Sequence, residues 1–230
     1  MGVRLNHLIE LLPRKDRERL LSICEPVDLK LSEVLYRSGE LTRRVYFPID
    51  CIISLVTPID GKLGLEVGMV GREGMAGANL ILGVRSTSLQ AVVQGPGKAW
   101  SAGSVPFRRE LARSPALQRC LNRYLHVLMT QFAVSAGCLR FHLIGPRLAR
   151  WLLMTQDRAS GDSFDMTQKF LAYMLGVRRV GITAAAGALQ RAGLIEYRRG
   201  RLAVLNRRGL VAAACGCYAT DSKSYAKLLH

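Results

Sequence analysis

The stretch from residue 164 to residue 205 constrains the fold of this chain most strongly. Its sequence is FDMTQKFLAYMLGVRRVGITAAAGALQRAGLIEYRRGRLAVL. Thr167 suits the N-cap of a helix over 168–175, and Gly176 interrupts the helical pattern. A second helix is predicted over 178–191, because apolar side chains recur there at spacings of three and four. Two helices joined by a short turn containing glycine are typical of a helix-turn-helix.

A basic hairpin is predicted directly after the second helix. Gly193 is placed to end that helix. Strands are expected over 194–197 and 202–205, with the sequence RRGR at 198–201 forming the turn between them. Helix, turn, helix and hairpin together indicate a winged helix.

The start of the second helix carries the residues expected to contact DNA. In a helix-turn-helix, the N-terminal residues of the second helix meet base edges in the major groove, where arginine can donate two hydrogen bonds to guanine. The residues expected at the bases are Arg178, Arg179, Val180 and Thr183, with Gly181 in the same turn. The residues expected at phosphates are Thr167, Gln168, Arg199 and Arg201. A helical hairpin with a solvated basic rim is the alternative interpretation.

The charge of the chain favours a polyanionic partner. The formal net charge is +16, of which residues 140–230 carry +10 and the longer segment 1–139 carries +6. The excess therefore accompanies the helix-turn-helix, where phosphate contacts would need it. HExxH, GxSxG and P-loop patterns are absent from the sequence, so we expect no enzyme activity and no catalytic residue. We also expect no membrane-spanning segment and a cytoplasmic location.

Residues before position 114 show the period of strands. One or two helices are expected over 5–24, and from residue 26 apolar and polar side chains alternate. Short strands are predicted over 27–31, 34–36, 45–47, 52–56, 65–67, 89–93 and 98–100. This spacing favours a β-sandwich or β-roll.

A long helix is predicted from Pro115 to about Phe141, after a short one over 106–111. Its apolar stripe consists of Leu117, Leu121, Tyr124, Leu128 and Phe132. Such a stripe could pack on the β domain and still offer a coiled-coil seam to a second copy. Burial entirely within one chain is the alternative. A further helix is expected over 147–158, followed by a polar loop over 159–163.

The order of these elements resembles the Crp/Fnr family of bacterial transcription regulators. The resemblance covers nearly the whole chain and is strongest at 166–195, where the family's threonine, turn glycine and recognition arginine fall on Thr167, Gly176 and Arg179. It implies an α+β fold with an antiparallel, jelly-roll-like β-roll sensor over 1–114, a dimerisation helix and hinge over 115–143, and a winged helix-turn-helix over 144–230. It also implies a homodimer on a palindromic duplex, with RNA polymerase as a further partner. The alternative is a sensing module whose winged helix contacts a protein.

Two positions of the recognition helix depart from the best-known family member. That member uses an arginine, an adjacent glutamate and a later arginine, which fall here on Arg179, Val180 and Ala184. Valine cannot accept a hydrogen bond from cytosine, although it can contact a thymine methyl group. The resemblance therefore implies a different target sequence.

The sensing end departs further from the family. Cyclic-nucleotide-binding members use a Gly-Glu pair and a later arginine pair. Here Arg72-Glu73-Gly74 stands at the first pair and Ser88-Leu89 at the second. Without that arginine a phosphate loses its charge-assisted contact, which argues against a cyclic nucleotide. The candidate effector residues are Gly71, Glu73, Gly74 and Arg85. The glycine-rich run could instead only form tight turns.

The positions of the cysteines and histidines in the sequence indicate no metal or cofactor site. Cysteines stand at 24, 51, 120, 138, 215 and 217. The N-terminal cysteine cluster of the family's iron–sulfur branch is missing, which argues against that cofactor. Haem remains open, because His7, His126, His142 and His230 are too scattered to choose a ligand. Cys215 and Cys217 form the only close pair of cysteines in the sequence and could coordinate a metal ion or sense redox state. Because no histidine stands near them, we expect reduced, structural thiols and no metal.

Overall fold

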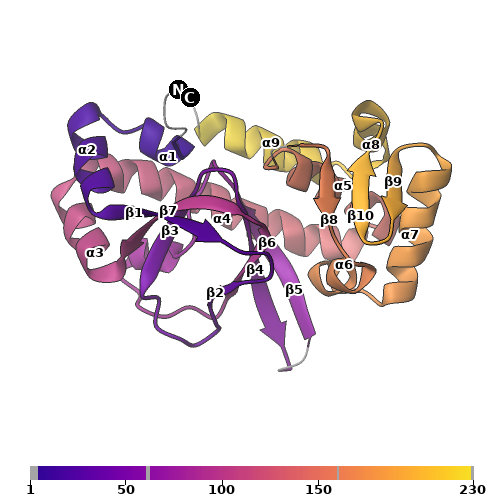
Figure 1. Ribbon diagram of the computed structural model, residues 1–230, viewed down its shortest axis with the longest axis horizontal. Coiled ribbons are helices and arrows are strands. Elements are labelled where there is room, and N and C mark those ends of the chain that lie inside the picture. The colour runs from indigo at the N-terminus through magenta and orange to yellow at the C-terminus, as the bar shows by residue number, and fades with distance from the viewer. Residues whose placement is uncertain (1–4, 61–62, 160, 229–230) are drawn as a thin grey trace.

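The computed structural model describes residues 5–60, 63–159 and 161–228, and shows a β domain beside a smaller helical domain (Figure 1). The chain begins with α1 (His7–Glu10) and α2 (Arg14–Ser22). These confirm the predicted N-terminal helices.

Two antiparallel sheets form the β domain. One sheet has the order β1-β7-β3, with β1 (Cys24–Leu29), β7 (Gly97–Gly103) and β3 (Arg44–Pro48). The other has the order β2-β6-β4-β5, with β2 (Val34–Tyr36), β6 (Gln90–Gly95), β4 (Ile52–Ile59) and β5 (Leu63–Val70). A 3₁₀ helix, η1 (Ala78–Leu82), lies between β5 and β6. The predicted antiparallel β-roll is confirmed.

The first strand begins and ends earlier in the chain than predicted. The prediction placed a strand over 27–31, whereas β1 begins at Cys24 and Leu31 lies in a turn with its side chain exposed. Cys24 pairs with Ala102 of β7, so the strand is extended by its partner beyond the alternating segment. The predicted turn at 59–62 includes Gly61 and Lys62, which lie outside the described residues.

The long helix α4 (Pro115–Phe141) follows α3 (Ser104–Arg113) and begins and ends as predicted. The Ser114 hydroxyl accepts a hydrogen bond from the Leu117 amide at 3.0 Å, and Pro115 occupies the first turn, where no amide hydrogen is needed. Leu117, Leu121, Tyr124 and Leu128 are buried in the core of the β domain. Most of the predicted apolar stripe is therefore buried within one chain, which agrees with the alternative interpretation of this helix.

The next helix starts earlier than predicted. We expected it over 147–158, but α5 runs from Ile144 to Gln156. Gly145 and Pro146 lie in its first turn, where proline is tolerated because the amide would have no helical partner. The hinge between α4 and α5 is therefore short.

The C-terminal domain contains the predicted winged helix. It comprises β8 (Ser163–Asp165), α6 (Gln168–Leu175), α7 (Arg179–Arg191), β9 (Ile195–Arg198) and β10 (Arg201–Val204), followed by α8 (Arg207–Ala213) and α9 (Cys217–Leu228). Its sheet has the order β8-β10-β9. The polar loop predicted over 159–163 is correct except that Ser163 already belongs to β8, and Ser160 lies outside the described residues.

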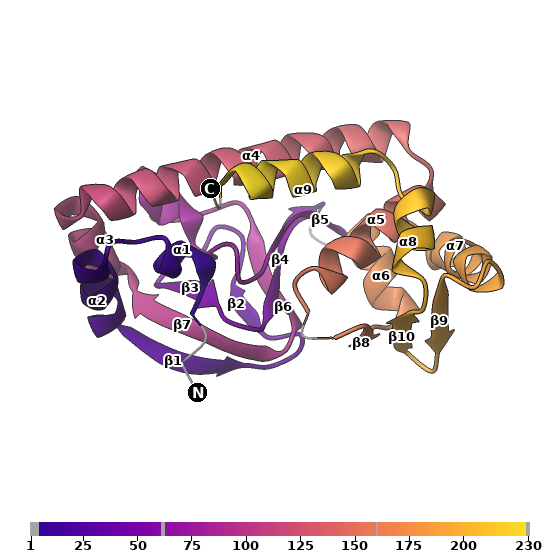
Figure 2. The same ribbon diagram turned by 90° about the horizontal axis from the view of Figure 1, so that it is seen from above.

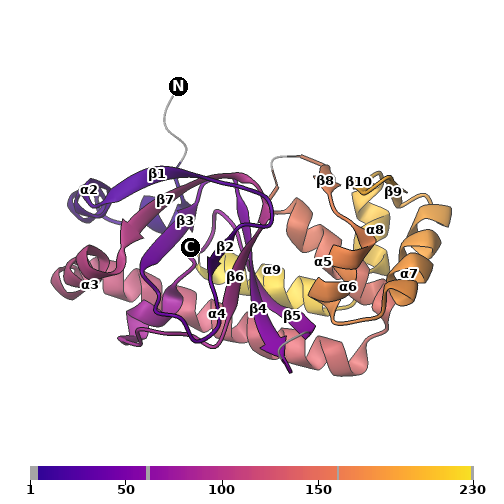
Figure 3. The same cartoon turned by 60° about the horizontal axis from the view of Figure 1, so that its bottom comes forward.

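The last helix returns to the β domain. Figures 2 and 3 show α9 lying along α4, and Tyr225 of α9 packs on the core of the β domain. Conversely, Ile52 and Met69 of the β domain pack in the hydrophobic cluster of the winged helix. The two domains therefore share packed surfaces. In the ranges that the structure describes, none of the helices has the combination of length and apolar character that a bilayer crossing needs.

Candidate nucleic-acid interface

The turn between α6 and α7 is built by local sequence signals. The Thr167 hydroxyl accepts a hydrogen bond from the Phe170 amide at 3.1 Å and caps α6. Gly176 ends α6 with φ of 61° and ψ of 41°, the left-handed conformation that glycine adopts without steric cost. A β-carbon at Gly176 would also lie 2.8 Å from Leu65 Cδ1 of β5. The left-handed conformation is therefore the main reason for glycine in this turn, because the Leu65 methyl group ends a flexible side chain.

The second helix of the motif exposes the predicted base-contacting face. Ile182, Ala185, Ala186 and Leu189 are buried against the domain core. On the opposite side Arg178, Arg179 and Thr183 are exposed, and the apolar Val180 is 72% exposed. Gly181 is half-buried, and a β-carbon there would lie 2.8 Å from Ile144 Cδ1. Gly181 therefore allows close packing of α7 on α5 rather than presenting a group to DNA.

A small polar cluster organises the exposed face. The Gln168 side-chain carbonyl accepts hydrogen bonds from the Thr183 hydroxyl at 2.8 Å and from Arg179 Nε at 3.4 Å. These contacts join the first turn of α6 to the first turns of α7. Because its carbonyl is engaged, Gln168 can meet a phosphate only through its Nε2 group, which donates as a phosphate requires.

The hairpin turn is a narrow basic wing. Arg199 and Gly200 have φ of 51° and 82°, the two positive values of a type I′ turn, and Arg198 pairs with Arg201 across it. Arg199 and Arg201 are exposed at the tip. The Tyr197 amide donates to Gln190 Oε1 of α7 at 3.2 Å, which fixes the wing beside the recognition helix. An open groove of acidic and basic side chains, including Asp165 and Glu196, lies along the hairpin.

The candidate effector residues do not form one open site. The Glu73 carboxylate accepts from Arg158 Nε at 2.7 Å and from the Gly71 amide at 3.1 Å, so it is already engaged. A β-carbon at Gly74 would lie 2.8 Å from the Tyr124 ring, which shows that this glycine allows close packing on α4. Arg85 is exposed in the loop after η1 and does not line the cavity beside Glu73.

Sequence reasoning missed one group of side chains. Cys215 and Cys217 were set aside because no histidine stands near them in the sequence, but His142 Nδ1 lies 3.6 Å from Cys217 Sγ. Cys138 completes the group, with its sulfur 3.5 Å from that of Cys215. The one available signal was the spacing of four between Cys138 and His142, which brings the two residues close together where α4 ends.

The fold and the exposed helix define a winged-helix, DNA-binding class of protein with a β-roll beside it. The family model of the Crp-like helix-turn-helix domain matches residues 146–213. A search of curated proteins found no match.

Similar solved structures extend the likeness to most of the chain. A putative Crp/Fnr-family transcriptional regulator from Eubacterium rectale is 13% identical with a TM-score of 0.70, covering 90% of this chain and 96% of its own. FixK2 from Bradyrhizobium japonicum is 13% identical with a TM-score of 0.67, covering 84% and 98%. A Crp/Fnr-family regulator from Thermus thermophilus is 20% identical with a TM-score of 0.66, covering 83% and 98%. The chain has the fold of these Crp/Fnr-family regulators, and its residues 146–213 match the Crp-like helix-turn-helix domain.

Proposed function

We propose that two copies of this chain bind one palindromic DNA site, each placing α7 in a major groove. The observation that carries the proposal is the exposed start of α7. Arg178, Arg179 and Val180 are exposed there, whereas the opposite face of α7 packs on the domain core. Two-fold symmetric proteins of this kind present their recognition helices about one DNA turn apart.

The roles of the exposed residues follow from their chemistry. Arg178 and Arg179 donate to guanine O6 and N7, Val180 contacts a thymine methyl group, and Thr183 contacts an adjacent base. Thr167, Gln168, Arg199 and Arg201 donate to phosphates on either side of the groove. Gln168 has a second role, because its carbonyl positions Arg179 before DNA arrives.

A second stripe on α4 supplies the dimer contact. Its members are exposed and recur at alternating spacings of four and three, the heptad pattern of a coiled-coil seam: Asn122, His126, Met129, Ala133, Ala136 and Arg140. They lie on a different face from the buried stripe of Leu117, Leu121 and Leu128. The small residues Ala133 and Ala136 would allow two such helices to approach closely.

The orientation of the winged helix depends on its contacts with the β domain. Tyr173 of α6 packs over Gly64 of β5, where a β-carbon would overlap the tyrosine ring. Trp151 Nε1 of α5 donates to Glu66 Oε1 of β5 at 2.8 Å. An effector of the β domain would act by altering these contacts and hence the spacing of the recognition helices. Gly71, Gly74 and Arg85 stay the candidate effector contacts, and Glu73 would join them only after leaving Arg158. RNA polymerase is the proposed further partner.

The dimer proposal is tested by comparing two exposed apolar positions. Met129 on the α4 seam is 67% exposed and Leu82 on η1 is 68% exposed. Sedimentation velocity and duplex binding would be measured for the wild type, Met129→Lys and Leu82→Lys. We expect only Met129→Lys to shift the chain to a monomer and weaken binding. A wild-type monomer that binds a single half-site with full affinity would overturn the proposal.

A further inference from the structure

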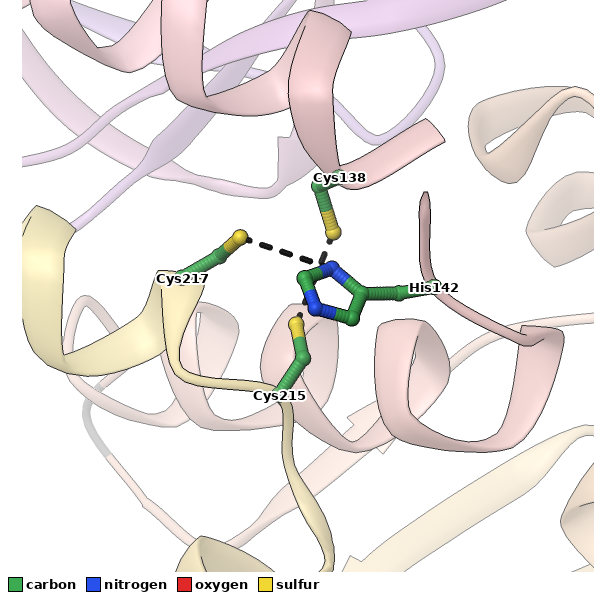
Figure 4. Close-up of side chains that lie close together, drawn as sticks. All are labelled: Cys138, His142, Cys215 and Cys217. Atoms are coloured by element: carbon green, nitrogen blue, oxygen red, sulfur yellow. Dashed lines mark hydrogen bonds between the residues drawn. The ribbon is translucent and has the colours of Figure 1, made fainter. Parts of the chain in front are cut away.

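Four side chains with metal-binding atoms converge at the end of α4. They are Cys138 from the last turn of α4, His142 from its C-cap, and Cys215 and Cys217 from the segment that leads into α9. Figure 4 shows all four pointing toward a common centre. One ligand atom from each lies within 4.8 Å of the others.

Two of the separations between ligand atoms match those that a small tetrahedral ion requires. Zinc bonds sulfur at about 2.3 Å and nitrogen at about 2.0–2.1 Å, so tetrahedral ligands lie about 3.8 Å apart for two sulfurs and about 3.6 Å apart for sulfur and nitrogen. The Cys138 and Cys215 sulfurs are 3.5 Å apart, and Cys217 Sγ lies 3.6 Å from His142 Nδ1. Three thiolates and one imidazole also form one of the ligand sets found in structural zinc sites.

The chain positions these ligands with ordinary secondary structure. Cys138 and His142 stand four residues apart, so both project from the same side where α4 ends, and the His142 amide bonds to the Cys138 carbonyl at 3.1 Å. Cys215 follows α8, and its amide contacts the Pro146 carbonyl of α5 at 3.4 Å. The site thereby joins two segments that are distant in the sequence, since Cys138 and Cys215 are 77 residues apart.

Solvent access and two arginine side chains characterise the surroundings of the four ligands. Cys138 and Cys215 are buried, whereas Cys217 and His142 are half-buried, which leaves a path from solvent for an ion. Arg147 and Arg150 line the same small cavity as Cys138 and are themselves nearly buried. Arg150 is balanced by Asp221, with Nε and Oδ2 2.9 Å apart, so Arg147 supplies the cationic charge that lowers the cost of burying thiolates.

We propose that Cys138, His142, Cys215 and Cys217 bind one Zn²⁺ ion. The ion would tie the end of α4 to the segment between α8 and α9, and would hold α9 along α4. Because α8 and α5 belong to the winged helix, the same bond network would fix that domain relative to the long helix.

The test begins with the full-length protein purified in reductant and dialysed with a slight excess of Zn²⁺. We expect one equivalent of zinc per chain by elemental analysis. Exchange for Co²⁺ should give the intense visible bands of a tetrahedral thiolate complex. Cys217→Ser should lose the metal on dialysis against a weak chelator, whereas Cys24→Ser, a matched change at a half-buried cysteine in β1, should retain it.

A second measurement on the wild type keeps the proposal testable if a variant fails to fold. Zinc should slow alkylation of Cys138, Cys215 and Cys217 by iodoacetamide, read residue by residue by mass spectrometry, without slowing that of Cys24. Reduced protein that takes up no zinc or cobalt would overturn the proposal, as would equal protection of all cysteines. A Cys138–Cys215 disulfide that forms in air in protein unable to bind metal would identify a redox pair instead.

Discussion

Arg158 and Glu73 form a nearly buried ion pair between the segment after α5 and the loop after β5, with Nε and Oε1 2.7 Å apart. Arg158 also donates to the Met154 carbonyl at 2.8 Å and stacks on the Tyr225 ring at 5.0 Å. The pair thus joins the β domain, the winged helix and α9. We therefore expect this ion pair to help hold the DNA-binding domain against the β domain.

Glu73→Gln should destabilise the protein by about 3–5 kcal/mol, because it leaves the buried Arg158 charge without its counterion. Urea unfolding of the full-length protein measures this. Glu18→Gln is the control, since the Arg14–Glu18 pair is exposed and screened by solvent and should contribute little to stability. Equal effects of the two changes would contradict the role given to the Arg158–Glu73 pair.

Stability should fall as pH rises through neutrality because of Glu66. Burial raises the pKa of Glu66 to about 7, against the hydrogen bonds from Ser54 and Trp151, which lower it. A carboxyl with a folded-state pKa above its unfolded value of about 4.3 contributes stability that is present below pH 4 and lost as pH rises through 7. Glu66→Gln should therefore flatten the dependence between pH 5 and 8, as measured by urea unfolding at each pH. An unchanged slope in the variant would assign the dependence to another group.

Gly176→Ala should cost more than about 1 kcal/mol, because alanine is strained at positive φ and its β-carbon would meet Leu65. Gly137→Ala on α4 is the matched control. No atom lies within 4 Å of the β-carbon position there, and the change should stabilise the helix by about 0.5–1 kcal/mol. Thermal unfolding of both variants at one protein concentration gives the comparison. A stabilising Gly176→Ala would show that the turn does not need a left-handed residue.

Arg179→Ala should cost about 1–3 kcal/mol of binding to the preferred duplex and relax selectivity at one base position. Arg201→Ala should instead weaken binding to all sequences and reduce the slope of log affinity against log salt by about one. Fluorescence anisotropy with matched and mismatched duplexes at several salt concentrations separates the two effects. Uniform weakening by Arg179→Ala would remove its assignment to a base.

Val180→Glu should change which base is preferred rather than abolish binding. Glutamate accepts a hydrogen bond from cytosine N4, which valine cannot do. Because Val180 is exposed and packs on nothing in the core, the fold should tolerate the change. Selection of duplexes with the variant should enrich cytosine at one position of each half-site. Loss of all binding with intact folding would argue that Val180 faces a phosphate.

Local signals were enough to predict the helix-turn-helix. Thr167, Gly176 and Gly193 mark the ends of its helices within the sequence itself, and α6 begins and ends as predicted. The start of α4 was predicted from Pro115, and in the structure Ser114 supplies the N-cap before it. Such signals depend only on neighbouring residues.

Contacts between distant residues could not be predicted in the same way. Glu73 and Arg158 are 85 residues apart, and Cys138 and Cys215 are 77 apart. The return of α9 to α4 brings Tyr225 to the β domain, and no periodicity in residues 217–228 indicates that packing partner. For the same reason the pairing of Glu73 was missed, and with it the loss of an open carboxylate in the effector region.

Selection of random duplexes by the purified full-length protein, at one moderate salt concentration, tests the central claim most directly. The account predicts that the wild type enriches a palindrome whose half-sites are centred about 10 bp apart. It also predicts that Arg179→Ala no longer selects one of the enriched bases in each half-site. Enrichment of a single, asymmetric half-site would contradict the symmetric dimer. Binding of all duplexes alike would contradict base contacts by the exposed start of α7.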